Sequence, residues 1–216
     1  MIPIRDAQKR RRAPLATWGL AAANAAAFAW ELSLGPGAGA ALARVAISPA
    51  EVVALSEPLA LPFRLLASLF LHAGWIHLLG NLAFLLVFGD DVEGRLPRAR
   101  FLALYLLSGL AASLTQIAAT PRSALPLVGA SGAIAGVLGA FLVLFPRARL
   151  TGVLPVGCLV LPLRSRAFLF IPGWFALQLT GALLAPPGSA AGGVAWYAHL
   201  AGFVAGPILL LLLRRR

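Results

Sequence analysis

Six apolar segments divide the chain, and short groups of basic residues separate several of them. A helix of about 20 apolar residues spans the hydrocarbon core of a bilayer, so segments of this length are typical of membrane-crossing helices. We therefore predict an all-α fold, a polytopic membrane bundle of six transmembrane helices. The predicted helices cover approximately residues 15–34, 74–92, 101–119, 130–146, 168–185 and 196–213.

The longest predicted connection, residues 35–73, follows the first apolar segment. It begins with GPGAGA and continues with mixed apolar and polar residues. Within it, FRLLASLF (Phe63 to Phe70) predicts a short helix that lies in the membrane interface with its apolar face toward lipid. A loop of this length is usually functional, although a plain external connector is the alternative interpretation.

The composition agrees with a membrane protein, because 60% of the 216 residues are hydrophobic and only 12% are charged. A soluble domain needs many more charges to cover its surface. The basic KRRR before the first segment resembles a signal peptide, but that segment is long and has no clear cleavage site. We predict a basic cytoplasmic segment at 1–14, a membrane domain at 15–213 and a basic cytoplasmic tail at 214–216.

The net charge of +11 raises the possibility of a nucleic-acid partner. The basic residues flank apolar segments and form no single patch, so we expect no such partner.

With six crossings, 15 of the 18 lysines and arginines lie on one side, and only Arg44, Arg64 and Arg122 lie on the other. Basic residues remain cytoplasmic, which predicts two cytoplasmic termini and an external first loop. We expect a multi-pass protein of the bacterial inner membrane.

Few polar residues interrupt the apolar segments, and each is a functional candidate because polar groups are costly at membrane depth. No Asp or Glu lies in the core of a segment, which argues against an ion pump, a transporter and an aspartyl protease. The chain has no HExxH motif, and one of its three histidines falls in the predicted first loop. We expect neither a metal nor another cofactor. The remaining candidates are His77, Asn81, Ser131 and His199, with Asn24, Gln178 and Thr180 as further notable positions.

Ser131 and His199 could form a nucleophile and its general base. A serine hydroxyl is a poor nucleophile unless a neighbouring imidazole accepts its proton. Two stripes of small residues would allow the two helices to approach closely in lipid. These stripes are Gly132, Gly136 and Ala140 after the serine, and Gly202 and Gly206 after the histidine. Glycine-rich packing without catalysis is the alternative interpretation.

His77 and Asn81 lie four residues apart, which places them on one face of a helix. Their N–H groups, with the backbone amide of Ser131 at a helix N-terminus, could stabilise the negative charge that acyl transfer places on a carbonyl oxygen. The alternative is that both side chains only hydrogen-bond to neighbouring helices.

Four motifs together resemble those of the rhomboid intramembrane serine proteases. LFLHAGWIHLLGNLAFLLVFGDDVEGRLP (Leu69 to Pro97) is similar to the second-span block of that family, with its H-x-x-x-N at His77 to Asn81 and its E-x-R at Glu93 to Arg95. His72 matches the additional upstream histidine of the family. GASG, which includes Gly129 and Gly132, resembles the nucleophile motif, and AHLAGFVAG (Ala198 to Gly206), which includes Gly202, resembles the last-span motif.

The resemblance implies a serine endopeptidase with a Ser131–His199 dyad and an oxyanion pocket formed by His77, Asn81 and the Ser131 amide. It also implies an outward-opening cavity, the fifth span as a possible substrate gate, and substrates that are single-span membrane proteins. A catalytically inactive relative that binds membrane clients is the alternative. Two positions depart from the family: Phe63 precedes Arg64 where Trp is common, and Ala135 stands where some members carry an aromatic residue that stacks on the imidazole, a role that Trp196 could take.

Overall fold

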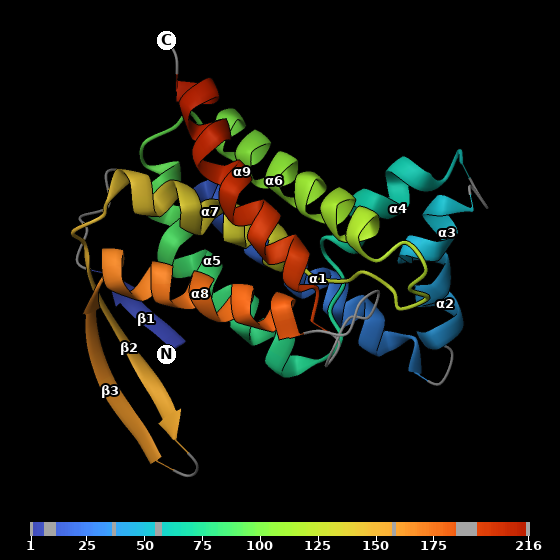
Figure 1. The fold of residues 1–216 in the computed structure, drawn as a ribbon, viewed down its shortest axis with the longest axis horizontal. Coiled ribbons are helices and arrows are strands. Elements are labelled where there is room, and N and C mark those ends of the chain that lie inside the picture. Colours follow the sequence, from blue (N-terminus) through green and yellow to red (C-terminus); the bar gives the residue numbers. More distant parts are fainter. Residues whose placement is uncertain are drawn as a thin grey trace.

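A computed structural model describes residues 2–6, 12–35, 38–54, 58–156, 159–184 and 194–214, most of which are helical (Figure 1). A helix occupies each of the six apolar segments. These helices are α1 (Leu15–Ser33), α5 (Trp75–Glu93), α6 (Arg98–Ala119), α7 (Ser131–Leu144), α8 (Ala167–Leu184) and α9 (Trp196–Arg214).

Four of these helices, α5, α6, α8 and α9, are long and apolar enough to cross a membrane. Helix α7 is apolar but has only 14 residues, and α1 carries the polar residues Asn24 and Glu31 on its buried face. The structure is therefore that of a multi-pass membrane protein, and the count of six crossings stays a prediction.

The predicted first loop contains three short helices, α2 (Ala38–Val45), α3 (Pro49–Val53) and α4 (Leu61–Ser68). The short helix expected at residues 63–70 corresponds to α4, displaced by two residues toward the N-terminus. The buried guanidinium of Arg64 holds the three helices together: its Nε donates to the carbonyl oxygen of Ala46 at 2.9 Å, and its Nη2 lies 3.1 Å from Oε1 of Glu51. This segment is therefore a packed helical unit at one end of the molecule (Figure 1).

The prediction of an all-α fold is wrong in one respect, because three strands form a small antiparallel sheet in the order β1-β2-β3. The strands are β1 (Ile2–Asp6), β2 (Arg149–Val156) and β3 (Leu159–Arg166). Prolines at 155 and 162 oppose a helix between α7 and α8, whereas the β-branched residues of this segment, three valines and Thr151, favour extended pairing. Leu150 of β2 is fully buried and joins the sheet to the helical core.

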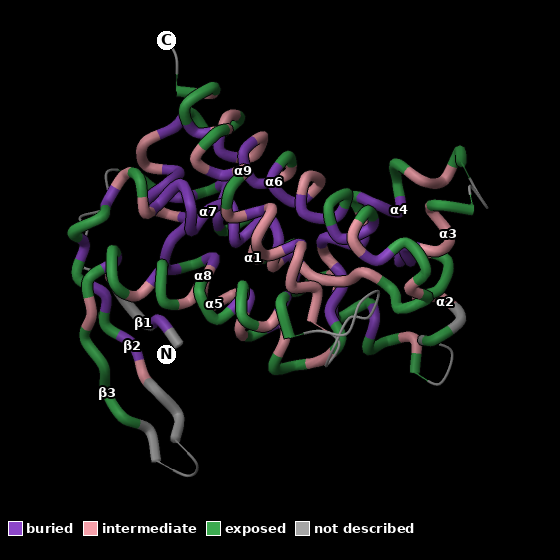
Figure 2. The backbone as a smooth tube through the Cα atoms, in the orientation of Figure 1, coloured by how far each residue is buried: buried purple, intermediate pink, exposed green. Residues whose placement is uncertain are grey.

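Helix α7 lies at the centre of the bundle, and every residue from Gly132 to Phe141 is buried (Figure 2). The backbone of α7 at its glycines lies against α9, while a Cβ atom on Gly132 or Gly136 would meet Ala112 or Ser108 of α6. A Cβ atom on Gly206 would lie 1.8 Å from the carbonyl oxygen of Gly136, and one on Gly202 would lie 2.0 Å from that of Gly132. Helices α7 and α9 thus pack face to face through their small residues, as the glycine stripes predict.

Glu93, at the last position of α5, has a fully buried side chain. Its carboxylate accepts hydrogen bonds from the backbone amides of Ala16 at 3.1 Å and Thr17 at 2.8 Å, and from the Thr17 hydroxyl at 2.9 Å. A carboxylate at a helix N-terminus satisfies free N–H groups and interacts favourably with the helix dipole. Glu93 therefore anchors the start of α1 to the end of α5.

The contact between α7 and α9 gives a stability prediction. Gly206→Ala should lower the free energy of unfolding by about 1–3 kcal/mol, the usual cost of overpacking, because its methyl group meets backbone that cannot rotate away. The matched control is Gly19→Ala on α1, where no atom lies within 4 Å of the added Cβ. Thermal or denaturant unfolding in detergent measures both variants, and equal stability of the two would contradict the prediction.

Candidate active site

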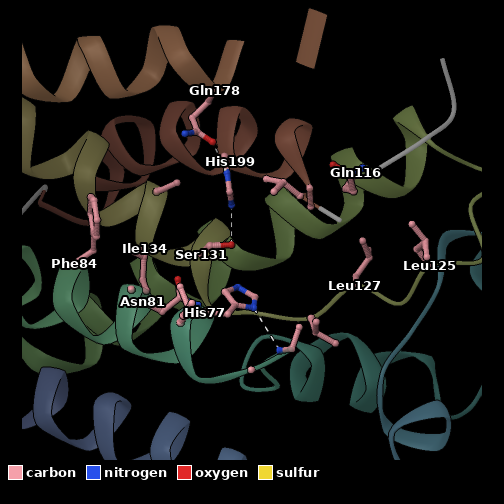
Figure 3. Close-up of a pocket in the computed structure, with 18 of the residues that line it drawn as sticks. His77, Asn81, Phe84, Gln116, Leu125, Leu127, Ser131, Ile134, Gln178 and His199 are labelled. Atoms are coloured by element: carbon pink, nitrogen blue, oxygen red, sulfur yellow. Dashed lines mark hydrogen bonds between the residues drawn. The ribbon is translucent and has the colours of Figure 1, made fainter. Parts of the chain in front are cut away.

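Ser131 and His199, which are far apart in sequence, meet at the ends of two packed helices. Ser131 begins α7 and His199 lies in the first turn of α9. The distance from His199 Nε2 to Ser131 Oγ is 2.8 Å, within hydrogen-bond range (Figure 3). The close approach of Gly132 and Gly202, one residue after Ser131 and three after His199, brings the two side chains within reach of each other.

The second nitrogen of the His199 ring contacts α8. His199 Nδ1 lies 2.6 Å from Oε1 of Gln178 (Figure 3). The ring centroids of Trp174 and Trp196 lie 6.0 Å and 6.4 Å from that of His199. Trp196 is thus near the imidazole, as the departure at Ala135 suggested. The contacts of Gln178 and Trp174 with His199 were not predicted from the sequence. A glutamine four residues after a tryptophan on an apolar helix was an available signal.

His77 lies directly against the loop that precedes Ser131. Gly129 has a φ of +121°, and a Cβ atom there would lie 2.7 Å from both Cε1 and Nε2 of His77. The backbone N–H of Ala73 points toward His77 Nδ1 at 3.4 Å, which makes Nδ1 the acceptor and leaves the ring proton on Nε2. Only glycine fits this backbone conformation together with the adjacent ring. The imidazole therefore presents an N–H donor to the start of α7.

Asn81 is oriented by His72, which lies between α4 and α5. His72 Nδ1 donates to the carbonyl oxygen of Phe70 at 2.9 Å, so Nε2 accepts the 3.0 Å hydrogen bond from Asn81 Nδ2. Burial, with a smaller contribution from His77, lowers the pKa of His72 to about 4, so the ring is neutral at pH 7. An amide nitrogen carries two N–H groups, and this contact uses one of them.

One cavity of about 950 Å³ is lined by Ser131, His199, Gln178, His77 and Asn81, among other residues. The volume is at the upper end of the range for small-molecule sites and could hold several side chains of an extended peptide. The walls are mostly apolar, and none of the described residues that line the cavity is a carboxylate. The polar residues that line it are His77, Asn81, Gln116, Thr120, Ser123, Ser131, Gln178 and His199.

The histidines form no three-ligand metal site in the part of the chain that the structure describes. The rings of His72 and His77 are neighbours, with centroids 5.1 Å apart, while His199 contacts Ser131 and Gln178. A separate group of acidic side chains, Asp6, Asp90 and Asp91, gathers near the end of α5. That group lies on the order of 20 Å along the helix from His77, given 1.5 Å of rise per residue.

A sequence model of the Rhomboid domain matches residues 61–216. The chain belongs to the rhomboid family. It is 41% identical over 80 residues to Rhomboid protease GluP of Bacillus subtilis (strain 168), covering 37% of this chain and 15% of that protein. It is 39% identical over 80 residues to RHOMBOID-like protein 5 of Arabidopsis thaliana, covering 37% of this chain and 26% of that protein.

Relatives with different activities share this similarity. Inactive rhomboid protein 1 of Drosophila melanogaster is 37% identical over 82 residues, which cover 38% of this chain and 6% of that protein. The matched segments span about a quarter or less of these three relatives. Membership of the rhomboid family therefore leaves the activity of this chain to be argued from its site.

The buried contact of His72 predicts a pH dependence of stability. A folded-state pKa of about 4 lies below the ordinary value of 6.5, so the unfolded chain binds more protons between these values. The stabilisation is present above pH 6.5 and is lost as the pH falls toward 4. His72→Gln cannot titrate in this window, so its unfolding free energy should fall less steeply between pH 7 and 4.5. Equal slopes for the wild type and the variant would contradict this prediction.

Proposed function

We propose that this rhomboid is an intramembrane serine endopeptidase that cleaves single-span membrane proteins near the outer face of the bilayer. The observation that supports the proposal is the 2.8 Å contact between His199 Nε2 and Ser131 Oγ. A general base must lie within hydrogen-bond reach of the proton that it removes, and this pair meets that requirement. Both groups also open onto the same cavity.

The proposed reaction is acyl transfer in two steps. His199 Nε2 accepts the proton of the Ser131 hydroxyl while Oγ attacks the scissile carbonyl carbon and the carbonyl π electrons move to oxygen. The tetrahedral intermediate collapses, the C–N bond breaks, and the imidazolium returns its proton to the leaving amine. Water, deprotonated by the same imidazole, then attacks the acyl carbon, the bond from that carbon to Oγ breaks, and the imidazolium returns its proton to Ser131 Oγ.

Three donors are available for the oxyanion of this intermediate. The backbone amide of Ser131 is one of the first N–H groups of α7, which lack partners within their own helix. His77 carries its ring proton on Nε2, and Asn81 has an N–H beyond the one bonded to His72. Donors positioned at the developing charge are usually worth about 10²–10³ in rate each. The supporting residues His72 and Gly129 would act by positioning Asn81 and His77.

We also propose that both termini lie in the cytoplasm and that the helical first loop faces outward, in the inner membrane of a bacterium. The support is the charge bias, with 15 of 18 lysines and arginines on one side of a six-crossing arrangement. In this orientation Ser131, at the start of α7, lies toward the outer face.

The dyad gives the central activity prediction. Ser131→Ala and His199→Ala should each abolish cleavage of a single-span reporter that the wild type cuts, because each removes a reacting group. Asn81→Ala should lose less activity, since two other donors remain. The measurement is reporter cleavage in proteoliposomes, with Gly19→Ala as a folded control. Near-normal cleavage by His199→Ala would contradict the dyad.

Active-site labelling separates a protease from an inactive relative that only binds membrane clients. A fluorophosphonate should label the wild type at Ser131 and leave Ser131→Ala unlabelled. Chelation with EDTA should leave cleavage unchanged. A wild type that binds single-span clients but neither labels nor cleaves would favour the inactive relative.

The proposed orientation predicts which loops are accessible from each side. In a Cys158→Ser background, Ala124→Cys, between α6 and α7, should react with a membrane-impermeant maleimide added to intact cells. Arg147→Cys, at the opposite end of α7, should react only after the cells are opened. Both positions are exposed, so access depends on the side of the membrane. The reverse pattern would contradict the orientation.

A further inference from the structure

Helix α8 carries a buried amide that contacts the imidazole of His199. The buried residues of α8 are Ala167, Ile171, Gln178 and Ala182, which lie along one face of the helix. Gln178 is the only polar member of this face. An aliphatic side chain would fill the same space without the cost of burying an amide. The presence of a glutamine at this position therefore requires a function for its hydrogen bond to His199.

We propose that Gln178 is a positioning residue that fixes the tautomer of His199; this inference rests on the proposed function. A general base at Nε2 requires the imidazole proton on Nδ1. The Oε1 of Gln178, 2.6 Å from Nδ1, is an acceptor and favours that tautomer. If the amide were reversed, its NH₂ group would face Nδ1, the ring proton would move to Nε2, and His199 could not accept the serine proton.

The side chains that pack around His199 do not distinguish its two ring nitrogens, so the hydrogen bond to Gln178 is needed for that distinction. Ala135, four residues after Ser131, offers only a methyl group toward the cavity, whereas two tryptophans flank the ring. One of them, Trp174, lies one turn before Gln178 on α8, so both side chains share a helix face. Packing restricts the plane of the ring, but only a hydrogen bond distinguishes its two nitrogens. Gln178 provides that distinction without placing a charge in the apolar cavity wall.

The arrangement also connects catalysis to the position of α8. Ser131 and His199 belong to α7 and α9, which the glycine contacts hold together independently of α8. The tautomer of His199 depends on α8 through one side chain. An outward displacement of α8 would therefore leave the serine and histidine paired in space but remove the acceptor that makes Nε2 the base.

Kinetics of three variants test the proposal in proteoliposomes with a single-span reporter. Gln178→Leu fills a similar volume without an acceptor. It should lower kcat by about ten- to hundredfold with little change in KM. This loss is smaller than the loss caused by removing a charged partner of a protease histidine. Gln178→Glu should restore most of kcat and move the acid limb of the kcat/KM profile to higher pH, because a carboxylate favours the protonated ring. Leu177→Ala, whose side chain is 69% exposed, is the control and should match the wild type.

A second measurement reports the tautomer without activity. The chain has three histidines, so the ¹⁵N shifts of their imidazoles can be assigned by comparison with His199→Ala. The wild type should carry the His199 proton on Nδ1, and Gln178→Leu should shift the population toward Nε2. A wild-type proton on Nε2, or a Gln178→Leu kcat equal to that of the wild type, overturns the proposal. If Ser131→Ala cleaves normally, the proposed function fails instead, and the ¹⁵N result still decides the role of Gln178.

Discussion

The backbone contact between α7 and α9 is the constraint on which the site depends. Gly136 and Gly206, like Gly132 and Gly202, leave no room for a single carbon atom between the two helices. In lipid, where apolar side chains gain little by leaving their surroundings, close packing of small residues is a principal source of helix association. The same contact fixes the separation of Ser131 and His199, so the stability of the bundle and the geometry of this pair have one physical cause.

Three buried polar side chains of the bundle are each held by a residue from another element. Asn81 of α5 contacts His72 of the preceding loop, His199 of α9 contacts Gln178 of α8, and the buried Glu93 binds the first amides of α1. A buried polar group is costly without a partner, so these contacts stabilise the packing of the elements that supply them. They also restrict the orientation of each side chain, as required of groups that act on a reacting bond.

Periodicity and motif spacing were sufficient to locate the six apolar helices and four polar residues that line the cavity, His77, Asn81, Ser131 and His199. Local spacing predicts which residues share a helix face. This applies to His77 with Asn81 and to the glycines that follow Ser131 and His199. The three-stranded sheet was missed because β1 comes from a basic segment and pairs with a hairpin 140 or more residues away in sequence. Gln178 was noticed as polar, but its partner could be known only once α8 and α9 were placed side by side.

The described residues that line the cavity include no carboxylate, and this absence determines the chemical character of the site. An ionised acid beside His199 would stabilise the imidazolium strongly, yet removing that charge from water in an apolar bundle is expensive. A neutral amide can orient the ring at a much smaller cost of burial. In the proposed reaction, charge separation arises only when the serine proton is transferred, next to the N–H donors at the start of α7. An apolar membrane interior favours this arrangement, because a neutral amide costs less to bury than a charge. The N–H donors lie where the proposed reaction places negative charge.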